Sequence, residues 1–60
     1  MPPPREILFE FTQVGHSVRV MAIDVDSGTE VVFQAPVNLS TSEMKTMGVK
    51  KLDYVMAKKK

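Results

Sequence analysis

The side chains that could carry chemistry are few and widely spaced in this chain of 60 residues. His16 is the only histidine and cysteine is absent, so disulfides and cysteine-built metal sites are excluded. A nucleophilic serine or threonine needs a base beside it, whereas His16 lies at a predicted turn tip. The sequence also has no Gly-x-Ser-x-Gly motif and no glycine-rich phosphate loop. We therefore predict that the protein is not an enzyme and has no catalytic, metal-binding or cofactor-binding residues.

Paired carboxylates can act as a general acid and a general base, and Asp24 and Glu30 are the candidate pair in this sequence. A hairpin between residues 17–25 and 29–35 would set them opposite each other on the solvent face. Like charges repel there, and water and salt weaken the repulsion. The Asp-Ser-Gly sequence between the two segments lacks the ligand positions of an EF-hand. It predicts a three-residue turn with Gly28 in the left-handed region.

Lysines are concentrated in the last third of the chain, where six of them stand against two carboxylates. Lysines contact phosphates, and Tyr54 or Phe33 could stack on bases, so nucleic-acid binding is our alternative function. Against it, the isoelectric point of about 8.1 is low for a nucleic-acid-binding domain, and the helix lysines lie at different azimuths. The candidate nucleic-acid contacts are Lys50, Lys51, Lys58 and Lys59.

Three strand-like segments precede this lysine-rich region. Residues 6–14, 17–25 and 29–35 are rich in β-branched and aromatic side chains and nearly alternate in polarity. The Gly-His dipeptide between the first two segments suits a two-residue type II′ turn. Pro36 ends the third segment because proline cannot donate a ladder hydrogen bond. The pattern predicts an antiparallel meander.

A helix is predicted to begin at Thr41. Ser40 and Glu43 have the spacing of a capping box, in which each side chain satisfies a backbone donor of the other residue. Glycine in the middle of a helix is costly, so we expect Gly48 to allow close approach to the sheet. The apolar arc of the helix contains Met44, Gly48, Val49, Leu52, Val55 and Met56.

These elements predict an α+β fold, a three-stranded antiparallel β-meander with one C-terminal helix packed on one face (β-β-β-α). Residues 1–5 are expected to form a disordered proline-rich lead-in, residues 6–58 a single domain, and residues 59–60 a frayed lysine tail. No apolar run approaches the roughly 20 residues that cross a bilayer, and the start has no signal-peptide pattern. We therefore expect a cytoplasmic protein with no membrane partner.

The middle segment has apolar residues at both odd-numbered and even-numbered positions, so both faces of an unbroken strand would be apolar. The registers predicted from the two turns place the core on opposite faces. The two-residue turn sets Phe11 against Val20 on one face, whereas the three-residue turn sets Ile23 against Val31 on the other. A β-bulge near Met21–Ala22 would bring the second set round to the core. Without a bulge the sheet is apolar on both sides, and a monomer of this size rarely leaves such a surface in water. We favour the bulge and keep the two-sided sheet as the alternative.

The sequence also resembles a known family. The resemblance is carried by FEFTQVGHSVRVMAIDVDSGTEVVFQAP and by a helix containing KKLDYVMAKK. Both are similar to a small domain family of unknown function found in bacterial, chiefly alphaproteobacterial, proteomes, and the similarity runs from Glu6 onward. The resemblance implies a stand-alone small bacterial protein with no known activity, and it brings no catalytic or ligand residues.

The surplus of apolar side chains on a chain without a catalytic constellation predicts a non-catalytic module. Such a module would bind a protein partner or associate with itself, and a homodimer would cover the second apolar face. The alternative remains a nucleic-acid-binding accessory protein that uses the lysine-rich helix. The candidate interaction surface consists of Leu8, Met21, Ile23 and Val32.

Overall fold

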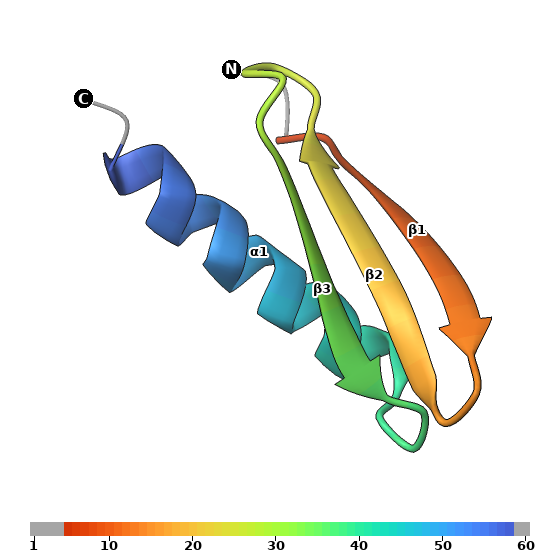
Figure 1. Cartoon of the computed structure of the whole chain (residues 1–60). Helices are drawn as coiled ribbons and strands as arrows, with labels where there is room; N and C mark the ends of the chain where they lie inside the picture. Colours follow the sequence, from red (N-terminus) through yellow and green to blue (C-terminus); the bar gives the residue numbers. More distant parts are fainter. Residues whose placement is uncertain (1–4, 59–60) are drawn as a thin grey trace.

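The computed structural model describes residues 5–58, which form one antiparallel sheet and one helix (Figure 1). The sheet order is β1-β2-β3, and the helix follows the last strand. The predicted β-β-β-α arrangement is therefore confirmed. The lead-in over residues 1–4 and the tail at 59–60 lie outside the described residues. The elements are β1 (Ile7–Val14), β2 (Ser17–Asp24), β3 (Glu30–Pro36) and α1 (Thr41–Lys58).

The first hairpin has the predicted turn and register. Gly15 has a φ of +62°, which is the left-handed value that a type II′ turn requires at its first central position. Val14 faces Ser17, and Phe11 faces Val20, as the two-residue turn predicts. Every residue of β1 thus has the face that alternation assigns to it.

The second hairpin differs from the three-residue turn that we predicted. The Asp24 N–H donates to the Thr29 carbonyl oxygen at 2.8 Å, so the loop contains four residues, 25–28. Gly28 does have the predicted left-handed φ, at +73°. Its N–H donates to the Asp24 carbonyl oxygen at 2.8 Å. The extra loop residue shifts β3 by one position along β2, and a shift of one turns every β3 side chain to the opposite face.

β2 runs through the sheet without a bulge. Each of residues 17–23 has one partner on β1 and one on β3, and Val20 lies between Phe11 and Phe33. The bulge that we favoured near Met21–Ala22 is therefore wrong. The two predicted registers differed by one residue. The extra residue lies in the second loop and not in the middle strand. The alternative, a sheet with apolar side chains on both faces, is the arrangement found.

α1 begins at Thr41, as predicted, and the capping box is formed. The Glu43 N–H donates to Ser40 Oγ at 3.1 Å, and the Ser40 N–H donates to Glu43 Oε1 at 3.1 Å. The Ser40 hydroxyl also donates to Glu43 Oε1, at 3.0 Å. The bonds from the Ser40 N–H and from the Ser40 hydroxyl lower the pKa of the Glu43 carboxyl group. Two backbone donors at the helix start are thereby satisfied.

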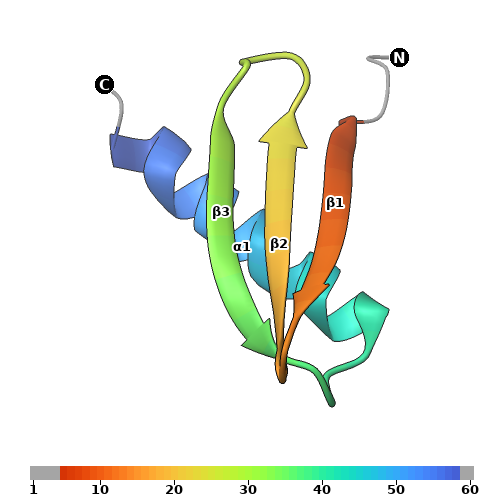
Figure 2. The same cartoon turned by 45° about the vertical axis from the view of Figure 1, so that its right-hand side comes forward.

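The core lies between the sheet and α1, which crosses one face of the sheet diagonally (Figure 2). Gly48 is the point of closest approach, because a Cβ built there would lie 2.8 Å from Phe9 Cε1 and 3.3 Å from Ala22 Cβ. The expectation that Gly48 lets the helix approach the sheet is confirmed. The buried apolar side chains are Val18, Val20, Ala22, Ala35, Met44 and Leu52.

No helix among the described residues, 5–58, is both long and apolar enough to cross a membrane. The cytoplasmic location stays a prediction.

Candidate functional site

Side chains on the face of the sheet away from α1 form the main candidate site, which we call the outer face. Alternation along the observed register places all four predicted interaction residues there. Leu8 faces Ile23 across β1 and β2, and Met21 faces Val32 across β2 and β3. Leu8 is 52% exposed and Val32 47% exposed, and the other two are half-buried. The four residues therefore form one continuous apolar surface over three strands.

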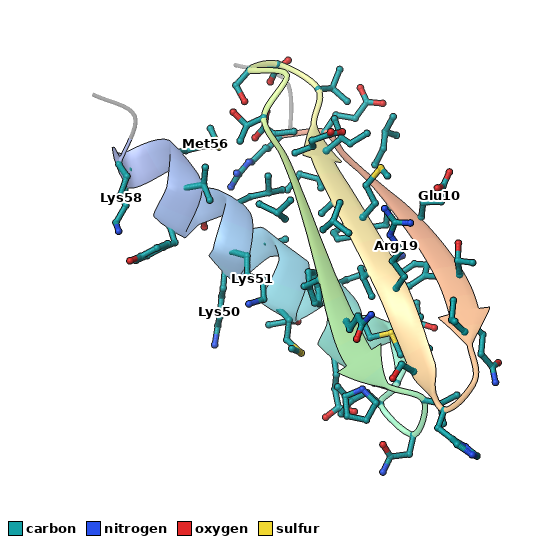
Figure 3. The ribbon with its side chains drawn as sticks, in the orientation of Figure 1. Glu10, Arg19, Lys50, Lys51, Met56 and Lys58 are labelled. Carbon is teal, nitrogen blue, oxygen red and sulfur yellow. The ribbon has the colours of Figure 1, made fainter. Side chains whose placement is uncertain are left out.

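Charged side chains border this apolar surface. Glu10 faces Met21 from β1, and Glu30 faces Ile23 from β3. Arg19 lies one step further along the same face of β2, and Figure 3 shows that Glu10 and Arg19 both point away from α1. Within residues 5–58, the ion pairs of the structure are made by Arg5, so Glu10 and Arg19 have no charged partner there. The outer face thus offers an apolar centre with charges of both signs at its border.

A shallow hollow of about 300 Å³ lies within the outer face. It is lined chiefly by Leu8, Glu10, Met21 and Ile23. Phe9 also contributes to its lining, and Glu10 is the one ionisable residue in it. The hollow suits an inserted apolar side chain, and Glu10 has no second ionisable group in it as a partner for acid–base chemistry.

The candidate nucleic-acid residues of α1 do not form one stripe. Lys51 Nζ lies 5.3 Å from the centroid of the Phe33 ring, and Lys58 Nζ lies 4.5 Å from that of Tyr54. Lys50 is exposed on the outer side of the helix (Figure 3), and Lys59 lies outside the described residues. Two of these ammonium groups thus already face aromatic rings, where cation–π attraction holds them.

A groove that the sequence did not predict lies between β3 and α1, and we call it the β3–α1 groove. It has a volume of about 410 Å³. Tyr54 is 62% exposed beside it, which is unusual for the largest side chain of the helix. The lining residues are Val31, Val32, Phe33, Lys50, Lys51, Tyr54 and Val55.

The second feature that sequence reasoning missed is a polar cluster around Arg5, which we had assigned to the lead-in. Arg5 Nε donates to Asp24 Oδ2 at 2.8 Å, and Arg5 Nη1 donates to Asp53 Oδ1 at 2.6 Å. The Ser27 N–H donates to the second Asp24 oxygen at 3.2 Å. The hydrogen bond from Arg5, followed by that from Ser27, lowers the pKa of Asp24. The signal was available, because Asp24 has the parity of Val20 and should point to the core.

The expectation that Asp24 and Glu30 face each other in solvent is wrong. Glu30 pairs with Ile23 and lies on the outer face, whereas Asp24 is 2% exposed and points toward α1. The cause is the four-residue loop, which moves Glu30 by one position along β2. Two carboxylates on opposite faces of a sheet cannot share a proton or a substrate.

His16 is exposed at the tip of the first hairpin. Over residues 5–58, the side chains of His, Asp and Glu form no group of three or more that could hold a metal ion.

Comparison with known proteins gives one match. The model of a family described as "Domain of unknown function (DUF6898)" matches residues 4–59. No curated protein matches the chain significantly. No solved structure matches it significantly either.

Proposed function

The chain belongs to the DUF6898 family of domains of unknown function, and we propose that it is a non-catalytic module that associates with itself through the outer face. The observation that carries the proposal is the apolar surface of Leu8, Met21, Ile23 and Val32, which α1 leaves uncovered. Covering such a surface removes apolar area from water, and this is the main favourable term in protein association.

The charges at the border favour a second copy of the chain as the partner. A twofold interface places the same patch on both subunits, so each charge meets the surface of an identical copy. Glu10 and Arg19 are exposed, opposite in charge and close together on the outer face. Two copies related by a twofold axis can pair Glu10 of each with Arg19 of the other. Such pairs add orientation and specificity more than affinity.

The size of the surface sets the strength of the association. Strands of seven or eight residues that rise about 3.4 Å per residue and lie about 4.8 Å apart give the three-stranded face a footprint on the order of 400 Å². A standard protein interface buries about 800 Å² on each partner. We therefore expect a reversible dimer that forms at high micromolar concentration.

Sedimentation velocity over a range of concentrations tests this function. Wild-type protein should convert from monomer to dimer as its concentration rises. Val32→Glu places a charge in the centre of the apolar surface and should keep the protein monomeric. Val37→Glu is the matched control, since Val37 is 42% exposed and follows β3 outside the sheet. A wild-type protein that stays monomeric up to millimolar concentration would contradict the proposal, as would a Val32→Glu variant that dimerises normally.

A further inference from the structure

Within residues 5–58, the outer edge of β3 pairs with no other strand, and the backbone groups that point to this edge can be assigned. The sheet order places β3 at one margin, with β2 as its neighbour. The Asp24 N–H donates to the Thr29 carbonyl oxygen, and residues that bond across an antiparallel pair alternate with residues that do not. Val31 and Phe33 therefore bond to β2. Residues 30, 32 and 34 direct their N–H and carbonyl groups to the free edge.

α1 extends past this edge. Figure 2 shows the C-terminal half of the helix running beyond β3, so the sheet is narrower than the helix that covers it. Tyr54, at 62% exposure, and half-buried Val55 lie in this half, and both line the β3–α1 groove. A strand added about 4.8 Å outside β3 would lie over these side chains. One extended segment would thus satisfy the free backbone groups of the edge and cover the apolar floor of the groove.

The positive charge of the groove indicates that the added segment is acidic. Lys50 and Lys51 line it, and no carboxylate does. Glu30 lies on the outer face of β3, away from the helix, and Asp53 is engaged by Arg5. A segment with carboxylates beside its apolar side chains therefore finds a complementary site.

We propose that the β3 edge and the β3–α1 groove bind an extended acidic segment of a partner protein as a fourth strand. Main-chain hydrogen bonds to residues 30, 32 and 34 hold the segment, as in other cases of strand addition. Its alternate apolar side chains contact Tyr54 and Val55, and its carboxylates pair with Lys50 and Lys51.

A second copy of the chain fits this edge poorly. Edge-to-edge pairing of β3 around a twofold axis would bring Lys50 and Lys51 of both copies to one seam, where like charges repel. The groove beside β1 is also a weaker site for such a segment. It is lined by Lys45 and Lys50, but Thr41, Ser42 and Thr46 stand there in place of most of the apolar and aromatic side chains of the β3–α1 groove.

Peptide selection followed by NMR titration tests this inference. Random ten-residue peptides displayed on phage are selected on the full-length protein, and we expect enrichment of peptides that alternate apolar and acidic residues. The best peptide is then titrated into ¹⁵N-labelled protein. Amide shifts should centre on residues 30–34 and 50–55. Failure to enrich acidic peptides, or shifts confined to β1 or to the outer face, would overturn the inference.

Charge reversal separates this site from the rest of the helix. Lys51→Glu should weaken binding of the selected peptide at least tenfold, whereas Lys45→Glu, on the other side of α1, should leave it unchanged. Gln34→Pro removes a free-edge N–H and should also weaken binding at least tenfold, since proline is tolerated at edge strands. A short single-stranded RNA titrated in parallel should cause no comparable shifts. Equal effects of Lys45→Glu and Lys51→Glu, or tighter binding of RNA than of peptide, would contradict the assignment.

Discussion

At the scale of single residues, the ion pair between Arg5 and Asp24 joins parts of the chain that are far apart in sequence. Asp24 ends β2, and Arg5 precedes β1 by two positions and also reaches Asp53 on α1. The carboxylate of Asp24 is 2% exposed, and burial of an unpaired charge is costly. The guanidinium of Arg5 and the N–H of Ser27 compensate for that burial. Arg5 therefore connects the N-terminal segment to Asp24, at the start of the second loop, and to Asp53 on the helix.

The lowered pKa of Asp24 predicts how stability depends on pH. A carboxyl group whose pKa is lower in the folded state contributes stability above its unfolded pKa, which is about 3.9. That contribution is lost as the pH falls through the folded pKa. Asp24→Asn removes the charge, so the variant should be less stable than wild type at pH 7, and the difference should shrink as the pH is lowered below about 4.

Urea denaturation followed by circular dichroism at several pH values measures this difference. Asp26→Asn is the control, because Asp26 is an exposed carboxylate in the same loop. Its substitution should change the free energy of unfolding little at pH 7. If the stability difference between wild type and Asp24→Asn were independent of pH, the ion pair with Arg5 would not be the source of the effect.

At the scale of elements, the contact between α1 and the sheet depends on the missing side chain at Gly48. The position opposite it is occupied by the Phe9 ring and by the methyl group of Ala22. Neither a methyl group on β2 nor the backbone of α1 can move far, because both belong to regular elements. The helix therefore lies as close to the sheet as a glycine allows.

Gly48→Ala should destabilise the protein by about 1 kcal/mol. Overpacking costs about 1 to 3 kcal/mol, and the higher helix propensity of alanine returns about 1 kcal/mol. Urea denaturation of Gly48→Ala, of Phe9→Ala and of the double variant measures the coupling between the two sites. In the Phe9→Ala background the Gly48 substitution should be neutral or stabilising. A stabilising effect of Gly48→Ala in the wild-type background would contradict the close approach.

The elements and most of the first hairpin were predictable from local signals. The capping box of Ser40 and Glu43 and the glycine of the first turn act within a few residues, so sequence spacing alone specifies them. The register of β3 was not predictable in this way. Gly28 has a positive φ in a three-residue and in a four-residue loop alike, so turn chemistry does not decide between them. The register of β3 is decided by packing of Val31 and Phe33 against α1, and this packing depends on the whole fold.

The candidate sites were predictable to different degrees. Leu8, Met21, Ile23 and Val32 were identified from surplus apolar residues, and the structure places them on one face. The β3–α1 groove was missed, because it exists only where the helix projects past the sheet. The angle at which a helix crosses a sheet is set by packing and leaves no pattern in the sequence.

At the scale of the whole molecule, the protein has two layers and therefore one covered sheet face and one bare face (Figure 1, Figure 2). Stable domains bury the apolar side of a sheet against another layer. Here the helix supplies that layer on the inner face, and nothing in residues 5–58 supplies it on the outer face. Self-association through the outer face would make a four-layer dimer, with helices outside and two sheets inside.

Intermolecular NOEs test this central claim most directly. Uniformly ¹³C,¹⁵N-labelled protein is mixed with unlabelled protein at millimolar concentration, and filtered spectra select contacts between copies. Self-association through the outer face predicts intermolecular NOEs from the methyl groups of Leu8, Met21, Ile23 and Val32, and none from α1. A protein that remains monomeric, or NOEs that arise from α1 instead of the outer face, would contradict it.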